Sequence, residues 1–134
     1  MTPEEIENFL KEPHIANLAT VRPDGSPHVA PVWFLYDGEQ VIVMAEKSAV
    51  KVRNMQREPR IMLSIATDQT PYQYVLVSGK ARITFDDEDE TELLRTISVQ
   101  YMGEVEGMEY AETTGKELDF CIIRLRPEKL IGWP

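Results

Sequence analysis

The chain has 134 residues, of which 43% are hydrophobic and 28% charged, and its formal net charge is −9 at pH 7. This length is typical of one domain, and a chain with Cys121 as its single cysteine cannot form an internal disulfide. It contains no apolar run near the ~20 residues that a membrane-spanning helix needs, and its acidic start is unlike the basic start of a signal peptide. We therefore expect one cytoplasmic domain over residues 1–134, with no membrane contact.

The negative charge is concentrated in one part of the sequence. Residues 86–119 hold twelve acidic and two basic residues, and DDEDETE at 86–92 is the most acidic part. Such a surface repels nucleic acids and anionic membranes, so we expect neither as a partner. By contrast, the stretch KSAVKVRNMQREPR at 47–60 holds five basic residues and one acid. A basic stretch of this size suits one small anion better than an extended polyanion.

The chain opens with a helix signal and continues as strands. Thr2 and Glu5 can form a capping box around Pro3 at the first helical position, and Pro13 follows the helix. Largely apolar runs separated by Asp-Gly turns then predict three strands in consecutive hairpins. These predicted strands are residues 14–22, 27–36 and 40–46.

Pro27 and Pro31 interrupt the second of these strands. Proline has no N–H group to donate to a neighbouring strand. The two prolines therefore place this strand at a sheet edge, at a bulge or next to a ligand.

The basic stretch should contain a short helix that Ser48 caps and Pro59 ends. Two further strands follow at 60–67 and 72–85, and Gly79 within the second indicates a bend or bulge.

The acidic block 86–92 should begin the next helix, because its carboxylates complement the positive end of the helix dipole. In that helix, Leu93, Leu94, Ile97 and Tyr101 have the spacing of a buried stripe. The remaining predicted elements are a helix at 104–113, a last strand at 118–126 and a tail at 126–134. About six strands in hairpins with helices beside them predict a mainly β fold, a small antiparallel barrel with peripheral helices.

Several catalytic and metal-binding arrangements are absent from the sequence. His14, His28 and Cys121 have no metal-ligand spacing, so we expect no metal site. The GxSxG, P-loop and GxGxxG patterns are also missing. Cys121 in the middle of a predicted strand indicates a buried small side chain, and His28 indicates a surface residue.

The basic stretch 47–60 has the parts of a phosphate site. A helix that starts near Ser48 offers free N–H groups and partial positive charge, with Lys51 in its first turn and Arg53 in its second. The alternative is a solvated basic helix face, which we assign to Arg57 and Arg60. For Lys51 and Arg53 the spacing slightly favours phosphate binding.

Aromatic residues follow the proline-interrupted strand. Trp33 and Tyr36 near a phosphate site suggest a flat, phosphorylated aromatic ligand that lies against the strand backbone. The alternative is an ordinary barrel core, which we assign to Phe34.

Four segments in this order and spacing resemble the pyridoxamine-phosphate-oxidase-like, flavin-binding split β-barrels. They are LATVRPDGSPHVAPVWF at 18–34, SAVKVRNMQREPR at 48–60, VSGKARI at 77–83 and RPEKLIGWP at 126–134. The run from 18 to 60 is most similar to the deazaflavin-dependent branch. The resemblance implies a six-stranded split barrel that forms a homodimer, with two cofactor sites at the subunit interface. It does not extend to the substrate-binding residues of true pyridoxamine phosphate oxidases, so that activity is not expected.

The resemblance also implies roles for individual residues in binding FMN or the deazaflavin coenzyme F420. Lys51 and Arg53 would hold the phosphate, with further contacts from Ser48 and Ala49 at the helix start. Val32 and Trp33 would line the ring. Tyr72 and Trp133 would approach from the partner subunit.

The implied function is hydride transfer between the cofactor and a small conjugated substrate, with no side chain needed as acid or base. F420 ranks first by family pattern. FMN follows closely, because the net negative charge opposes the glutamate tail of F420. Two alternatives remain: a non-catalytic FMN-binding or cofactor-carrier protein, and a sensor of a phosphorylated ligand.

Overall fold

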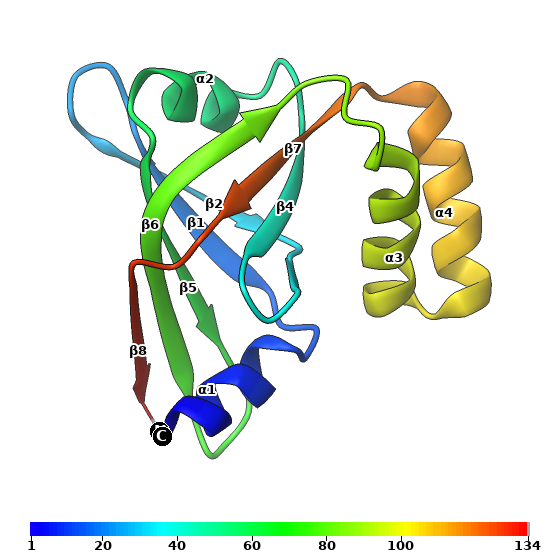
Figure 1. Ribbon diagram of the computed structural model, residues 1–134. Coiled ribbons are helices and arrows are strands. Elements are labelled where there is room, and N and C mark those ends of the chain that lie inside the picture. Colours follow the sequence, from blue (N-terminus) through cyan, green and yellow to red (C-terminus); the bar gives the residue numbers. More distant parts are fainter. Residues whose placement is uncertain (134) are drawn as a thin grey trace.

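The computed structural model describes residues 1–133 and shows a strongly curved antiparallel sheet with helices at both ends and along one side (Figure 1). The helices in this range are α1 (Pro3–Leu10), α2 (Val50–Arg57), α3 (Glu90–Met102) and α4 (Glu104–Glu117). The strands are β1 (Ala16–Val21), β2 (Pro27–Val32), β3 (Leu35–Tyr36), β4 (Val41–Glu46), β5 (Arg60–Ala66), β6 (Tyr74–Thr84), β7 (Phe120–Leu125) and β8 (Lys129–Trp133).

The strand order explains the curvature. Hydrogen-bonded neighbours follow the order β2-β1-β5-β6-β7-β4-β3, and β8 pairs with β6. Strands β2 and β3 stand at opposite ends of this order, yet only Trp33 and Phe34 separate them in the chain. The sheet must therefore curl until its two edges meet at these residues, which gives the split barrel that the sequence predicts.

The barrel interior is filled by alternating strand residues. In β5, Ile61, Leu63 and Ile65 are buried, while the residues between them face outward or are partly buried. Such a period of two is expected for strands with one face on a core. Phe34 is fully buried, as predicted. The short helix α1 covers one end of the barrel with Phe9 and Leu10, and its predicted capping box is present.

Strand β2 is an edge strand, which is one of the three positions that its two prolines allow. Gly79 lies where β6 changes its partner from β5 to β7. A Cβ atom at this position would lie 2.5 Å from Leu125 Cδ1 and 2.9 Å from the Arg126 carbonyl oxygen. The glycine thus permits a close approach of two chain segments.

Three predictions about the elements are wrong in detail. Helix α2 begins after Ala49, and no side chain caps it, so Ser48 is not the cap. The reason is a tight turn in which the Ala49 N–H donates to the Glu46 carbonyl and delays the helix by one residue. The single predicted strand 27–36 divides into β2 and β3, because the barrel closes between them. The predicted tail contains β8, which raises the strand count from about six to eight.

The acidic block begins α3 as predicted, with Glu90 and Glu92 in the first turn, but Asp89 at the N-cap makes no side-chain cap hydrogen bond. Asp86 instead accepts a hydrogen bond from Lys47 Nζ at 2.8 Å, and Asp87 accepts one from Arg124 Nη1 at 2.9 Å. Because its side chain is only 10% exposed, Asp87 is a structural ion-pair partner rather than a solvated charge. No helix within residues 1–133 is both long and apolar enough to cross a membrane.

Candidate functional site

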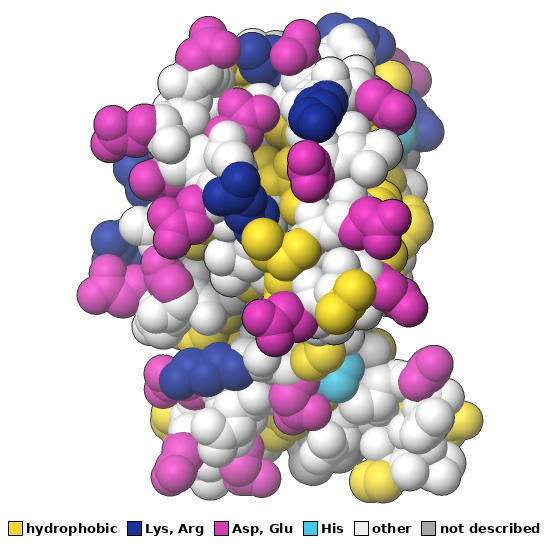
Figure 2. All heavy atoms as spheres, turned by 90° about the vertical axis from the view of Figure 1, so that its right-hand side faces the viewer, with side chains coloured by type: hydrophobic (Ala, Val, Ile, Leu, Met, Phe, Trp, Pro, Cys, Tyr) yellow, Lys and Arg dark blue, Asp and Glu magenta, His cyan; other side chains and the backbone are white. Residues whose placement is uncertain are grey.

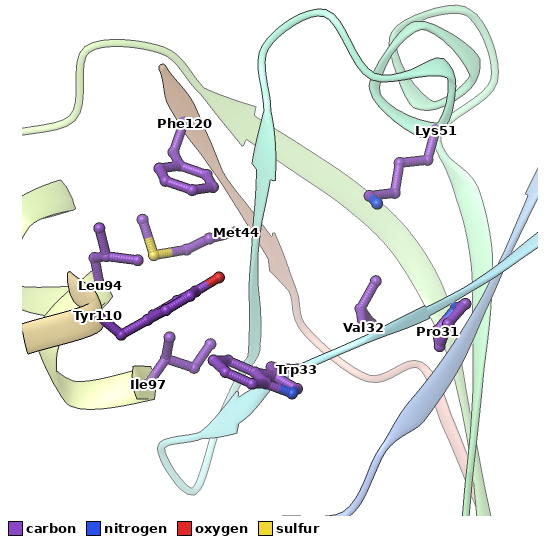
Figure 3. A pocket seen from close by; sticks show the side chains of 9 residues that line it. All are labelled: Pro31, Val32, Trp33, Met44, Lys51, Leu94, Ile97, Tyr110 and Phe120. Atoms are coloured by element: carbon purple, nitrogen blue, oxygen red, sulfur yellow. The ribbon is translucent and has the colours of Figure 1, made fainter. Parts of the chain in front are cut away.

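A cavity lies where the barrel closes, between the β2 end, α2 and the α3–α4 hairpin (Figure 3). Its volume is about 160 Å³. Most of its lining is apolar, and the polar side-chain atoms come from Lys51, Tyr110 and Trp33. The lining residues are Pro31, Val32, Trp33, Met44, Lys51, Leu94, Ile97, Tyr110 and Phe120.

Lys51 supplies the positive charge of the cavity. It stands in the first turn of α2, and Figure 3 shows its ammonium group directed into the cavity. None of the ion pairs within residues 1–133 involves Lys51. The neighbouring Lys47, in contrast, is paired with Asp86, and this hydrogen bond raises the pKa of the Lys47 ammonium. Lys51 is therefore a cation whose counter-ion this part of the chain does not supply.

The start of α2 adds hydrogen-bond donors beside Lys51. Because no side chain caps the helix, the N–H groups of Val50 and Lys51 remain available to a ligand, whereas the Val52 N–H donates to the Ala49 carbonyl oxygen at 3.1 Å. Arg53 lies on the exposed side of the same helix, and its Nη1 donates to the Ser48 carbonyl oxygen at 2.8 Å. This contact folds the guanidinium back over the turn that precedes the helix.

An aromatic cluster forms another wall of the cavity. The rings of Trp33 and Tyr101 are stacked, with centroids 4.8 Å apart and planes 4° apart. The ring of Tyr110 lies 5.7 Å from that of Trp33 at an angle of 55°. Trp33 therefore contacts both helices of the hairpin, one residue from each.

Tyr101 fastens this cluster to the barrel. Its hydroxyl donates to the His14 carbonyl oxygen at 2.6 Å and accepts the Phe34 N–H at 3.1 Å. Phe34 lies at the break between β2 and β3, where no strand partner takes its N–H group. Burial raises the pKa of the Tyr101 hydroxyl, so the group stays protonated and can act as a donor.

The structure brings together some of the predicted site residues and separates others. Val32, Trp33 and Lys51 line the cavity, while Ser48, Ala49 and Arg53 lie at the start of α2 outside the lining. Tyr72 lies in the loop between β5 and β6, and Trp133 pairs with Tyr74 at the far end of β6. Both are more than half exposed and away from this cavity, and their approach from a partner subunit remains a prediction.

Sequence reasoning missed the remaining wall of the cavity. Met44 and Phe120 come from the neighbouring strands β4 and β7, two positions apart in their register. The hairpin contributes Tyr110 together with the buried Leu94 and Ile97. The helical spacing of Leu94 and Ile97 indicated burial, but no signal in the sequence showed what they would cover. Cys121 is buried as predicted, and burial raises the pKa of its thiol. Within residues 1–133 no group of three or more His, Cys, Asp or Glu side chains could hold a metal ion.

The curved sheet and the cavity at its closure define a split-barrel protein of the flavin-binding type. The chain belongs to the pyridoxamine 5'-phosphate oxidase family, whose model matches residues 2–134.

Three similar proteins give this assignment more detail. The chain is similar to the heme oxygenase HutZ of Vibrio cholerae serotype O1, with 30% identity over 130 residues that cover 93% of this chain and 72% of HutZ. It is also similar to a solved F420 reductase, with 29% identity, a TM-score of 0.77 and coverage of 97% of this chain and 98% of that one. A conserved hypothetical protein from Mycobacterium tuberculosis shares the fold, with a TM-score of 0.83, 22% identity and coverage of 99% of this chain and 84% of that one.

Proposed function

We propose that two copies of this chain form a homodimer that binds coenzyme F420 or FMN and transfers a hydride between this cofactor and a small conjugated acceptor. When bound, such a cofactor supplies a ring that gives or accepts the hydride. One observation carries the proposal. The ammonium group of Lys51 points into an apolar cavity at the start of an uncapped helix, and no carboxylate within residues 1–133 pairs with it.

The residues at this end of the cavity fit a phosphorylated ring. Lys51 and the free N–H groups of α2 would hold the phosphate, because a cation and a helix start both stabilise an anion. Val32 and Trp33 would lie along the ring. Arg53, Ser48 and Ala49 would surround the phosphate from the solvent side.

The size of the cavity favours a site completed by a second copy. One chain encloses about 160 Å³, whereas pockets for cofactors and drug-sized ligands usually measure ~300–1,000 Å³. An uncovered sheet face is also available, where Val29, Met62 and Ile131 are 61%, 42% and 42% exposed. Pairing of two copies through this face would bury these apolar side chains. Tyr72 and Trp133 would then come from the partner subunit.

Two considerations bear on the identity of the cofactor. The similarity to an F420 reductase favours the deazaflavin. The acidic hairpin favours FMN, because it repels a tail of several glutamates. A solved structure of HutZ, with 27% identity to this chain, describes it as a heme storage protein, and this similarity favours a second candidate function, a non-catalytic cofactor-binding or carrier protein.

The test is a fluorescence titration of wild type and Lys51→Ala with FMN, riboflavin and F420. We expect Lys51→Ala to weaken binding of FMN and F420 by about ten- to a hundredfold, the usual effect of losing a hydrogen bond to a charged group. Riboflavin, which has no phosphate, should bind both proteins about equally. Arg53→Ala should weaken FMN binding by a similar factor.

Arg60→Ala is the matched control, because Arg60 pairs with Glu58 through Nη2 and Oε1 at 2.5 Å and lies just beyond the helix. Arg57 is less suitable, since it donates to the Val21 carbonyl and contributes to the fold. Equal losses of affinity for Lys51→Ala and Arg60→Ala would contradict the proposed site.

Light scattering should give a mass of about 31 kDa for the homodimer, twice the 15.4 kDa chain mass. Oxidation of the reduced cofactor by an added acceptor separates an enzyme from a carrier.

A further inference from the structure

We propose that the α3–α4 hairpin forms the binding site of the hydride acceptor and that the Tyr110 hydroxyl is the hydrogen-bond donor of this site. The site takes uncharged planar aromatic carbonyl compounds of the quinone class rather than anionic ones. This inference rests on the proposed function and specifies its substrate. It concerns the wall of the cavity opposite Lys51.

The position of Tyr110 is the first evidence. Figure 3 shows its ring extending from α4 across the cavity, with the hydroxyl oxygen directed toward the middle. The hydroxyls of Tyr36 and Tyr101 have partners in the chain, the Gly38 and His14 carbonyl oxygens. No hydrogen bond within residues 1–133 involves the Tyr110 hydroxyl. Tyr110 is 40% exposed and lines the cavity, so its hydroxyl is free to donate to a ligand.

The orientation of Tyr110 is set by its neighbours. Its ring packs at 5.7 Å against Trp33, which is stacked in turn on Tyr101. Because Tyr101 is hydrogen-bonded to two barrel segments, the cluster holds the Tyr110 ring at a defined place. A donor held in this way orients an acceptor better than a mobile surface side chain does.

The remaining surface of this wall defines the acceptor. Met44, Leu94, Ile97 and Phe120 are apolar and present no group that could bind an ion. A flat apolar ring fits such a surface, and one oxygen on that ring would pair with Tyr110. A quinone combines these features. It takes two electrons and one proton as a hydride, takes a second proton from water, and leaves as the hydroquinone while the reduced cofactor becomes oxidised.

The charge of the hairpin excludes anions. The segment 86–119 carries twelve acidic and two basic residues. Figure 2 shows the side of the molecule on which the hairpin lies, where many acidic and some basic side chains lie around exposed apolar ones. Glu106 stands one turn before Tyr110 on the same side of α4, and Glu109 is adjacent to Tyr110 in the chain. An anionic ring that approaches this wall meets a negative potential, whereas an uncharged ring does not.

The test uses 1,4-naphthoquinone and its 2-sulfonate, two probes that share a ring and differ by one negative charge. Their dissociation constants are measured by calorimetry on the protein loaded with oxidised cofactor, which requires no turnover. We expect wild type to bind the uncharged probe more tightly. Tyr110→Phe should weaken its binding about three- to tenfold, the usual effect of losing one neutral hydrogen bond. Tyr36→Phe, which removes a tyrosine hydroxyl outside the cavity, should bind like wild type.

The charge of the hairpin is tested separately. The double variant Glu106→Gln/Glu109→Gln should bind the sulfonate about two- to fivefold more tightly at about 20 mM salt and show little gain at about 500 mM, because salt screens exposed charges. Glu4→Gln on α1 is the control and should have no effect. Tighter binding of the sulfonate than of naphthoquinone by wild type would overturn the inference.

Failure of this inference can be distinguished from failure of the proposed function. The affinity of FMN is measured for every variant in parallel. If Tyr110→Phe binds naphthoquinone like wild type, or weakens FMN binding as much as naphthoquinone binding, the acceptor site is wrong while the cofactor site stands. If neither FMN nor F420 binds wild type, both proposals are wrong.

Discussion

The two walls of the cavity differ in how they are joined to the barrel. Helix α2 is part of the core: Val52 and Met55 are buried, and Asn54 donates a hydrogen bond to the buried Thr20 hydroxyl at 3.1 Å. The α3–α4 hairpin stands beside the barrel (Figure 1). Leu94, Ile97 and the aromatic cluster pack it against the barrel, and a few polar contacts fix its ends.

This difference has a consequence for function. The phosphate site that we propose on α2 needs a fixed position, and burial of α2 in the core provides it. The other wall contacts the barrel through separate side chains, so substitutions there can alter the hairpin without unfolding the barrel. The position of the hairpin should therefore affect acceptor binding more than phosphate binding.

The largest expected effect on stability comes from a substitution of Gly107, which lies where α4 packs against α3. A Cβ atom there would lie 2.6 Å from Val99 Cα and 2.7 Å from the Ser98 carbonyl oxygen, which are backbone atoms that cannot rotate away. We expect Gly107→Ala to lower the free energy of unfolding by about 2–3 kcal/mol, the cost of overpacking. Urea denaturation measures this change.

Gly115→Ala on the same helix is the matched control. Its Cβ would meet the flexible end of Leu94 at 3.3 Å, and alanine favours a helix over glycine by about 1 kcal/mol. We expect no destabilisation there. Equal losses at both glycines would mean that the helices of the hairpin do not pack as closely as the structure shows.

Removal of the Tyr101 hydroxyl is expected to have the next largest effect. Tyr101→Phe leaves the Phe34 N–H and the His14 carbonyl without this partner, which should cost about 1–2 kcal/mol of unfolding free energy. Tyr110→Phe should leave stability unchanged, because its hydroxyl contributes no such contact. Thermal denaturation of the two variants makes the comparison. A larger loss for Tyr110→Phe than for Tyr101→Phe would show that Tyr110, and not Tyr101, fastens the hairpin to the barrel.

The smallest expected effect on stability comes from the ion pair between Asp87 and Arg124 at the beginning of the hairpin. The hydrogen bond from Arg124 holds the pKa of the Asp87 carboxyl below its usual value. A lowered pKa in the folded state gives stability that is present above the unfolded pKa of about 3.9 and is lost as the pH falls through the folded pKa. We therefore expect Asp87→Asn to cost about 1 kcal/mol at pH 7 and progressively less below about pH 4.

Chemical denaturation of wild type and Asp87→Asn, at pH 7 and again below about pH 4, measures this difference in unfolding free energy. Asp68→Asn, in the exposed loop between β5 and β6, is the control and should change stability little at either pH. A loss for Asp87→Asn that stays constant down to about pH 2 would contradict the ion pair as its cause.

Local patterns in the sequence were sufficient for several features of the molecule. The capping box at Thr2 and Glu5 and the burial of Phe34 were predicted correctly, and the edge position of β2 is one of the three that its prolines predicted. These features depend on neighbouring residues: a hydroxyl three residues from a carboxylate, a proline without an N–H group, and an apolar side chain in a strand. For the same reason Lys51 was correctly assigned to the first turn of α2.

The tertiary structure alone decided where the elements meet. Nothing local requires the chain to divide a strand at Trp33 and Phe34; the division arises because the two edges of the curled sheet meet there. The strand at Lys129–Trp133 forms because β6 offers it an unpaired edge. Tyr110 lies 59 positions from Lys51 in the sequence, and only the packing of α4 against Trp33 brings both into one cavity. The sequence by itself determined the residue types and local conformations of this protein, because these depend on near neighbours. The cavity depends instead on contacts between distant segments, which form only when the barrel closes.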